Sequence, residues 1–440
     1  MKAFSTIAFR NVIKNWRHSL AATISISAGF VSLVLFQGYI IDVENMYQVG
    51  FRNRAMYGDI LLENPAQQTK EGRSEPEKFY ISEEHQAEIL QFLQSQSSKI
   101  RARVRFLPAT GVVSNGKTST IFLALGYDVD EGQIARGDVW RWDALFGKPL
   151  HLAGDPQGAL LGKSLGYILG CLPENSKTDL VQNGGYKPED RPFHCGLNTI
   201  QLTATTETGQ LNAIDLNVVG LNDGGYKDID ERWIKLSIEN VQALLNTKKI
   251  KFMSVLLNDG EDVFGLRDEI NLFLKQKDIP ILAQRWVDHP IADLYLQTMS
   301  LLNIFKSFIV VVIMTISGLS VFNTMVKIVK ERTKEIGTLR SLGYTGSQVG
   351  SIFTFEALYL SLLGISIGIA FSLLFTFWIN HSGIIYKAGL LSTPVLFKIV
   401  VSPPTYFISF ILLSFLAVTT SWISTRHIVN STVAENLTYA

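Results

Sequence analysis

The chain has 440 residues, of which 47% are hydrophobic and 18% are charged, and its mean hydropathy is +0.19. This mixture argues against an all-membrane bundle and fits a soluble domain joined to a few membrane spans. A net charge of +1 gives no basic footprint for nucleic acid, and two cysteines exclude a disulfide framework.

Residues 1–19 predict an amphipathic helix on the cytoplasmic membrane surface, with an apolar stripe that includes Phe9 and Val12 facing the lipid. The basic residues of this segment, which has no acid, are Lys2, Arg10, Lys14 and Arg17. Residues 20–41 follow as an uncharged run of 22 residues, long enough to cross a bilayer as the first span. Basic residues precede the run and acids follow it, so we expect its N-terminal end inside.

Residues 42–297 contain no apolar run long enough to cross a membrane. We expect them to form one large extracytoplasmic domain. The flanks, 58–111 and 237–286, show a strand–helix–strand order and predict an α/β subdomain. The stretch 112–236 is rich in strand signals, including a hairpin at Asn115-Gly116, and predicts an inserted β subdomain.

Cys171 and Cys195 both fall in this segment. A compartment outside the cytoplasm would allow them to form a disulfide, and two buried thiols are the alternative. The histidines are scattered without metal-ligand spacing, so the sequence predicts no metal site and no catalytic residue.

Two short motifs invite an enzymatic interpretation that their surroundings do not support. Residues 111–118 match the P-loop expression, but they lead into a strand where a phosphate site needs a helix N-terminus. Residues 162–166 match the nucleophile-elbow expression, but we expect a small packed helix there, without a buried strand before Ser164.

The remainder alternates spans and loops. We predict a second span at 298–326, a cytoplasmic loop at 327–349, a third span at 350–379, an outer loop at 380–402, a fourth span at 403–425 and a cytoplasmic tail at 426–440. Small residues suited to close helix packing occur in the first and third spans: Ser25, Gly29, Gly364 and Gly368. Glu356 lies inside the third span near its cytoplasmic end, and we interpret it as the partner of a basic group in the 327–349 loop.

The 327–349 loop is rich in Lys and Arg, which predicts a cytoplasmic position. Residues 330–342 are mostly good helix formers and predict a short helix at the membrane surface. Gly343 follows where a helix would end in a left-handed residue, and Thr345 with Gln348 gives a capping-box pattern for the next helix.

Residues 331–349, ERTKEIGTLRSLGYTGSQV, resemble the motif that follows the second span in the MacB/LolE/FtsX family of ABC transporter permeases. The matching positions are Glu331, Arg332, Glu335, Ile336, Gly337, Leu339, Arg340, Leu342 and Gly343. In that family the segment is the coupling helix that docks on the ATPase subunit. The resemblance implies an α-helical membrane protein with four transmembrane helices and a large α+β extracytoplasmic domain inserted between the first two, with porter-like flanks and a sabre-like insert.

The resemblance also implies a non-catalytic subunit that binds no cofactor, with ATP and magnesium held by a partner ATPase dimer. Further implied partners are the lipid bilayer, a second permease copy or paralogue, and a periplasmic adaptor or lipoprotein chaperone. The protein would lie in the bacterial inner membrane with both termini cytoplasmic. It would transmit force to extract or export a lipoprotein or another amphiphile. The alternatives are a tripartite efflux permease for peptides or toxins, and a signalling device that transports nothing.

Overall fold

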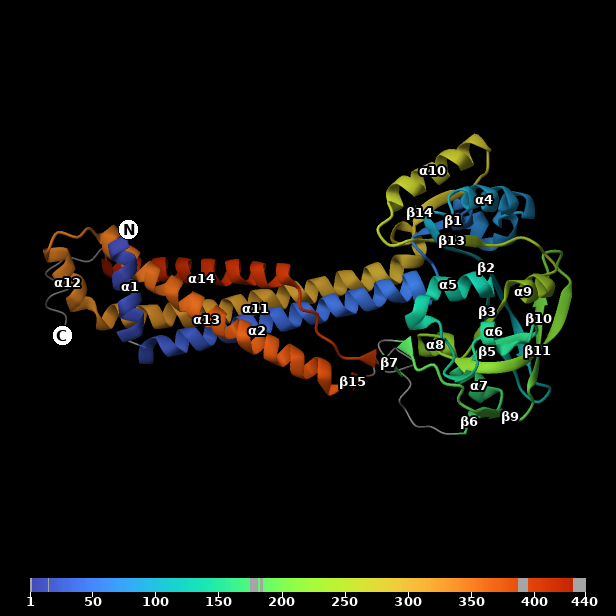
Figure 1. Cartoon of the computed structure of the whole chain (residues 1–440), viewed down its shortest axis with the longest axis horizontal. Helices are drawn as coiled ribbons and strands as arrows, with labels where there is room; N and C mark the ends of the chain where they lie inside the picture. The colour runs from blue at the N-terminus through green and yellow to red at the C-terminus, as the bar shows by residue number, and fades with distance from the viewer. Residues whose placement is uncertain (1, 15, 175–180, 183–184, 387–394, 430–440) are drawn as a thin grey trace. The chain divides into compact units, whose positions relative to one another are not determined.

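The computed structural model describes residues 2–14, 16–174, 181–182, 185–386 and 395–429 (Figure 1). The chain divides into two compact units. The membrane unit comprises residues 1–45, 297–384 and 397–440, and the inserted unit comprises residues 46–296 and 385–396.

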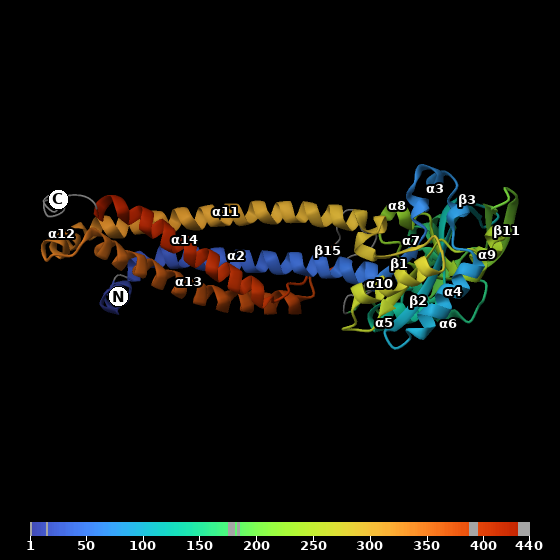
Figure 2. The same cartoon turned by 90° about the horizontal axis from the view of Figure 1, so that it is seen from above.

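Among the described residues, four helices are long and apolar enough to cross a membrane. They are α2 (Trp16–Val49), α11 (Asp293–Glu331), α13 (Gly346–Ser382) and α14 (Pro403–Val429). All four are longer than the predicted spans, because helical hydrogen bonding continues through the polar turns that flank each apolar run. The helices run alongside one another in both side views (Figures 1 and 2).

Close contact between α2 and α11 depends on small side chains. A Cβ atom added at Gly29 would lie 2.4 Å from the Ser317 Oγ of α11. The hydroxyls of Ser25 and Ser320 are 2.6 Å apart and bridge the same two helices. The small-residue positions predicted in the first span therefore lie at a helix interface.

The contact between α2 and α13 is equally close. A Cβ atom added at Gly364 would lie 2.9 Å from the backbone oxygen of Thr23. One added at Gly368 would lie 3.0 Å from the ring of Phe30. Because a backbone atom cannot rotate away, Gly364 sets how near the two helices approach.

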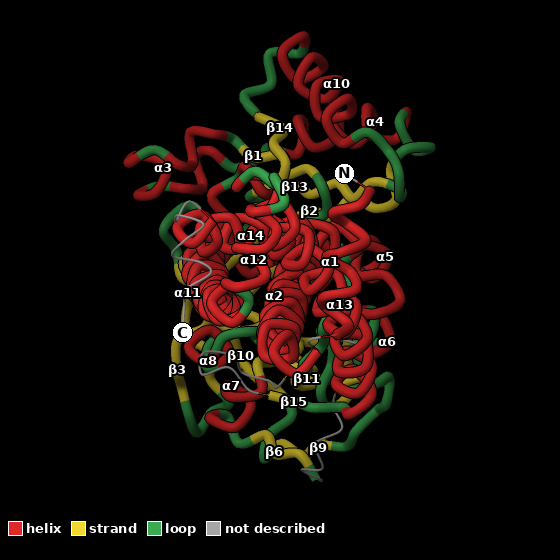
Figure 3. Tube along the Cα trace, turned by 90° about the vertical axis from the view of Figure 1, so that its left-hand side faces the viewer, coloured by secondary structure: helices red, strands yellow, loops and turns green. Residues whose placement is uncertain are grey.

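The N-terminal helix α1 (Lys2–Lys14) packs on α13 (Figure 3). The Ser5 and Tyr359 hydroxyls are 2.6 Å apart, and the Phe9 ring meets the Tyr359 ring edge-on at 5.5 Å. Val12 is 7% exposed and belongs to the core of the membrane unit. The prediction that this apolar stripe faces lipid is therefore wrong for Val12, which packs against protein.

The inserted unit is built on one ten-stranded sheet, in the order β10-β11-β5-β12-β3-β2-β13-β1-β14, with β4 paired to β11. Its strands are β1 (Ile60–Glu63), β2 (Ile100–Ser114), β3 (Ser119–Tyr127), β4 (Phe146–Gly147), β5 (Gly158–Gly162), β10 (Thr199–Thr205), β11 (Leu211–Asn222), β12 (Trp233–Ser237), β13 (Phe252–Leu257) and β14 (Leu282–Arg285). Two-stranded pairs join β6 (Cys171–Pro173) to β9 (Phe193–Cys195), β7 (Val181–Gln182) to β8 (Gly185–Tyr186), and β15 (Ile385–Tyr386) to β16 (Val395–Leu396).

Helices fill the connections of this sheet. The longer ones are α4 (Glu83–Ser95), α5 (Val129–Trp140), α9 (Ile238–Leu245) and α10 (Val263–Gln276). The shorter ones are α3 (Lys70–Ser74), α6 (Leu150–Ala153), α7 (Lys163–Ile168) and α8 (Lys227–Asp230), with 3₁₀ turns η2 (Pro65–Gln68), η3 (Pro76–Phe79), η4 (Trp286–Asp288) and η5 (Pro290–Ala292). The helices α4 and α10 lie side by side (Figure 1), where Phe92 stacks on Phe273 with ring centroids 4.4 Å apart.

The strand β2 joins the two parts of the sheet. Its first half pairs with β13, and its second half pairs with β3 and β10. The strands β13, β1 and β14 form what we term the flank edge, and β5, β11 and β10 form the insert edge. The β2–β3 hairpin turns at Asn115-Gly116 as predicted, with Gly116 at φ +82°.

The segment around Ser164 differs from expectation in one respect. The strand β5, which ends at Gly162, is fully buried and leads directly into α7. The sequence showed no such strand because only three apolar residues precede Gly162. The Ser164 amide donates to Asp230 Oδ2 at 2.8 Å, which supports the predicted small packed helix.

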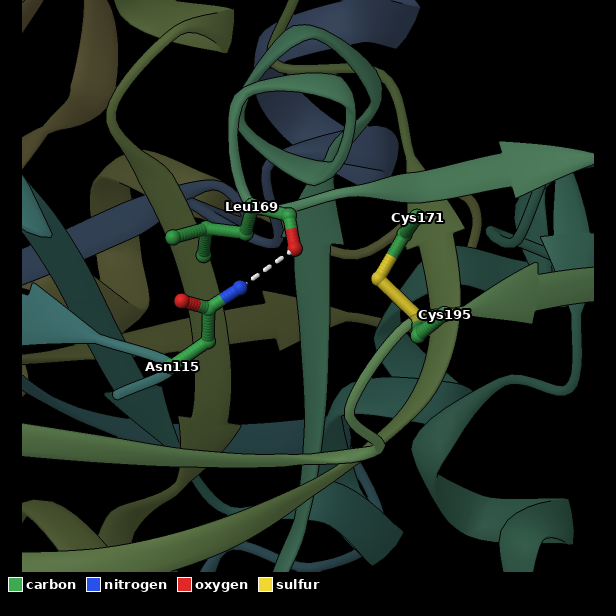
Figure 4. The surroundings of a disulfide bond; sticks show 4 residues. All are labelled: Asn115, Leu169, Cys171 and Cys195. Carbon is green, nitrogen blue, oxygen red and sulfur yellow. Dashed lines mark hydrogen bonds between the residues drawn. A yellow bond between two sulfur atoms is a disulfide. The ribbon is translucent and has the colours of Figure 1, made fainter. Parts of the chain in front are cut away.

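Cys171 and Cys195 are joined in a disulfide between β6 and β9 (Figure 4). Beside it, the Asn115 side chain donates to the Leu169 carbonyl at 2.7 Å. This bond ties the tip of the β2–β3 hairpin to the end of α7, next to the disulfide.

Candidate coupling site

The short helix α12 (Thr333–Ser341) lies between α11 and α13 at one end of the membrane unit (Figure 1). The predicted helix began at Lys330, but α11 continues to Glu331, and Arg332, at φ −107° and ψ 17°, separates the two helices. The predicted end is confirmed, since Gly343 has φ +96°. The predicted capping box of Thr345 and Gln348 is also confirmed at the start of α13.

One face of α12 is buried against the membrane unit. Thr333 and Ile336 are 4% and 1% exposed, and Gly337 is also buried. Leu339 packs against the same apolar core as a partly buried side chain. Ile336, Gly337 and Leu339, which the family motif includes, therefore fix the position of α12 against the membrane unit.

The exposed face of α12 and its flanks carries charges and one large apolar side chain. Its members are Glu331, Lys334, Glu335, Thr338, Ser341 and Leu342. Leu342 is 72% exposed at the last turn. Of the remaining motif residues, Arg340 is half-buried and Gly343 lies in the exposed turn that follows. We use the name exposed α12 face for six residues: Glu331, Lys334, Glu335, Thr338, Ser341 and Leu342.

Arg332 joins α12 to a carboxylate in α13. Its Nη1 donates to Glu356 Oε1 at 2.7 Å, and its Nε donates to Glu335 Oε2 at 2.7 Å. The guanidinium also lies over the Phe353 ring, 5.4 Å from the centroid. Glu356 is 3% exposed, and the predicted pairing with a basic group of the 327–349 loop compensates its charge.

A second donor reaches the same carboxylate from α1. Asn11 Nδ2 donates to Glu356 Oε1 at 2.6 Å. Glu356 therefore links three parts of the membrane unit: the helix α1, the Arg332 junction between α11 and α12, and α13 itself. Sequence reasoning missed Asn11 and Phe353, and the one available signal was that a buried carboxylate needs more than one donor.

A second group of buried charges lies in the inserted unit and was also not predicted. Arg136 Nη2 and Lys235 Nζ each lie 3.1 Å from Asp143 Oδ2. Burial would raise the pKa of the Asp143 carboxyl, but the two cations outweigh it and hold that pKa below its usual value. Burial lowers the pKa of the Lys235 ammonium to about 8, against the opposing attraction of Asp143.

The family match to known proteins falls almost entirely in the membrane unit. The FtsX-like permease C-terminal family matches residues 307–433, which include α12. The macrolide export ATP-binding/permease protein MacB 2 of Yersinia pestis is 28% identical over 168 residues, covering 35% of this chain and 23% of that protein. An ABC transporter permease of Methanocaldococcus jannaschii is 26% identical over 162 residues, covering 36% of this chain and 40% of that one.

The chain thus spans 23% and 40% of the length of these two relatives. Among solved structures, the periplasmic region of MacB from Actinobacillus actinomycetemcomitans is a distant likeness. Its identity is 12% and its TM-score 0.34, and the match covers 55% of this chain and 92% of that one. The family match across α12 places residues 307–433 in the FtsX-like permease C-terminal family, and together with the MacB-type relatives it supports a MacB/FtsX type of ABC transporter permease.

Proposed function

We propose that this chain is the non-catalytic membrane subunit of an ATP-driven complex, in which a separate ATPase moves α12 and the inserted unit responds. The observation that carries the proposal is the attachment of α12. Arg332 holds it to the buried Glu356 at 2.7 Å, and Ile336 anchors it in the apolar core. A helix that is fixed in this way transmits a displacement to the membrane helices, whereas an unattached loop would move without displacing them.

The exposed α12 face is the proposed contact with the ATPase dimer. Leu342 offers an apolar anchor, and Lys334 and Glu335 offer charges at the rim of the contact. ATP and magnesium would be held by the partner, and this chain would bind no cofactor.

Movement of α12 would reach the rest of the membrane unit through two routes. Arg332 directly precedes α12 and follows α11, so a push on α12 is delivered to the end of α11. Glu356 passes the same push to α13 and α1. A second permease copy or a paralogue would supply the symmetric arrangement needed for two discrete states.

We place the protein in the bacterial inner membrane, with both termini and α12 cytoplasmic and the inserted unit periplasmic. The excess of Lys and Arg between α11 and α13 supports this orientation. The disulfide between Cys171 and Cys195 agrees with an oxidising compartment for the inserted unit.

For the substrate, we favour a lipoprotein or another amphiphile that is extracted or exported, with a lipoprotein chaperone as a periplasmic partner. The size of the inserted unit supports a role beyond signalling, because a domain of about 250 residues offers room for a cargo surface. Efflux of peptides or toxins through a periplasmic adaptor is the second candidate. Signalling without transport is the third.

The test is ATPase stimulation in a complex of the full-length chain with its ATPase, reconstituted in lipid. Leu342→Asp places a charge at the proposed anchor and should reduce stimulation by an order of magnitude or more, since a central interface side chain contributes about 2 kcal/mol or more. Glu335→Lys should act in the same direction with a smaller effect. Gly337→Pro should uncouple the complex by breaking α12.

Leu272→Asp is the matched control. Leu272 is 61% exposed on α10 in the inserted unit, so the same change is made on an exposed leucine outside the site. Stimulation should stay at the wild-type level in this variant. Unchanged stimulation in the Leu342 and Glu335 variants would refute the contact.

A further inference from the structure

The last turn of the first membrane helix, η1 (Gly50–Arg54), differs in geometry from the rest of that helix. It is a π-helical turn that follows α2 directly. π-Helical turns are rare and often occur at functional positions, since they redirect the side chains that follow. The chain reverses just after it, where Met56 at φ +62° and Gly58 at φ +61° precede β1. The turn η1 therefore lies where a membrane helix enters the inserted unit.

Within η1, Arg52 points to the flank edge. Its Nε and Nη2 donate to the two carboxylate oxygens of Asp59 at 2.7 and 3.1 Å. Asp59 Oδ2 also accepts from the Leu257 amide at the end of β13, at 2.9 Å. This bidentate pair fixes η1 to the strands that follow it in the chain.

The start of α11 is attached to the same edge. The Phe51 ring stacks on Trp286 with centroids 5.3 Å apart, and Trp286 directly follows β14. His289 Nε2 lies 2.7 Å from Glu63 Oε2 on β1. The turn η1 after α2 and the segment that leads into α11 therefore both contact the flank edge.

Arg54 points to the other part of the unit. Its Nη2 donates to Asp223 Oδ2 at 2.6 Å and also to the Tyr186 hydroxyl. Its guanidinium lies over the Trp140 ring, 4.9 Å from the centroid. Asp223 directly follows β11 of the insert edge, and its side chain is 1% exposed. One π-helical turn therefore holds the flank edge through Arg52 and the insert edge through Arg54.

We propose that η1 is the joint through which movement of α2 reaches the insert edge, and that Arg54 is its positioning residue. This inference rests on the proposed mechanical function for its biological use, but the attachment itself is independent of any ATPase. A side chain that is charged, paired and stacked suits this role, because the planar guanidinium loses little freedom when it is held. Without Arg54, the insert edge would be joined to η1 only indirectly, through the sheet by way of β2 and through weaker contacts of neighbouring elements, such as Asn53 Nδ2 to the Ala135 carbonyl of α5 at 3.1 Å.

The experiment measures distances between spin labels in the full-length protein, without the ATPase. Both native cysteines are in the disulfide, so cysteines introduced at exposed sites are labelled alone. One pair joins Val49 at the end of α2 to Gln210 at the β10–β11 turn of the insert edge. A second pair joins Val49 to Gln276 at the end of α10, beside the flank edge.

In the unmodified background, both pairs should give one narrow distance peak. Arg54→Gln should broaden or split the Val49–Gln210 peak and leave the Val49–Gln276 peak narrow. Arg52→Gln is the matched control and should leave the Val49–Gln210 peak unchanged. Tyr186→Phe removes the hydroxyl that accepts from Arg54 and donates to Asp223, but it keeps the Arg54–Asp223 pair, and it should also leave that peak narrow.

The proposal is overturned if Arg54→Gln keeps the Val49–Gln210 peak narrow, or broadens both peaks equally. If Arg54→Gln does not fold, Arg54→Lys replaces it, because lysine keeps the charge opposite Asp223 but loses the planar group that lies over Trp140. Broadening of the Val49–Gln210 peak alone is expected there too, and an unchanged peak contradicts the joint. The two proposals can fail independently. If Leu342→Asp loses ATPase stimulation while its Val49–Gln210 and Val49–Gln276 peaks stay narrow, the contact with the ATPase is impaired and the joint at η1 is intact.

Discussion

Glu356 receives both Arg332 and Asn11 on one carboxylate oxygen. We expect Glu356→Gln to lower the unfolding midpoint of the membrane unit, at a cost of about 1–3 kcal/mol, because a partly buried guanidinium loses its countercharge. Thermal unfolding of the purified chain measures the shift. Glu335→Gln removes the other partner of Arg332, but Glu335 has a 60% exposed side chain, so the cost should be about 0–1 kcal/mol. Equal shifts in the two variants would contradict the special role of Glu356.

Lys235 gives the inserted unit a dependence on pH. Its folded pKa is about 8, below the value of about 10.4 expected in an unfolded chain. Between these values the unfolded state binds more protons, so the free energy of unfolding should rise with pH by up to about 1.4 kcal/mol per unit. Lys235→Met should remove this rise. The measurement is denaturant unfolding from pH 8 to 9.5, below the range where buried tyrosines such as Tyr127, with a pKa raised by burial to about 12, oppose the trend.

At the scale of elements, the approach of α13 to α2 depends on Gly364. Gly364→Ala should force the helices apart, because the added Cβ lies 2.9 Å from a backbone oxygen, and should destabilise the membrane unit by about 1–3 kcal/mol. Gly350 lies on the same helix with no atom within 4 Å of an added Cβ. Gly350→Ala should therefore be neutral or stabilising by up to about 1 kcal/mol. Thermal unfolding that places both variants at the same midpoint would rule out Gly364 as a packing position.

Features of the helices and strands that depend on neighbouring residues could be predicted from the sequence, whereas contacts between distant segments could not. The end of α12 at Gly343 and the capping box at Thr345 were predictable, because their signals lie within a few residues of one another. The bond from Asn11 to Glu356 was not, because 345 positions separate the two residues. The continuity of the ten-stranded sheet through β2 was not predictable for the same reason, since pairing with β10 and β13 depends on segments far along the chain.

At the scale of the whole molecule, orientation decides whether the proposed mechanism is possible. A force applied to α12 can act on the inserted unit across a bilayer only if the two lie on opposite sides. The distribution of basic residues favours this arrangement. Residues 327–349 carry five Lys and Arg, whereas the 380–402 loop carries two, Lys387 and Lys398. The disulfide belongs to the opposite compartment from the basic loop in this arrangement.

Cysteine labelling in intact cells tests this directly, because neither native cysteine is free. Lys117→Cys places a thiol in the exposed turn of the β2–β3 hairpin, and Ser341→Cys places one on the exposed end of α12. A membrane-impermeant maleimide added to cells with a permeable outer layer should label the first variant and not the second. Ser341→Cys should become labelled after the inner membrane is opened, which shows that its thiol is reactive. Labelling of Ser341→Cys from outside, or protection of Lys117→Cys, would invert the topology, and an ATPase in the cytoplasm would then have no access to α12.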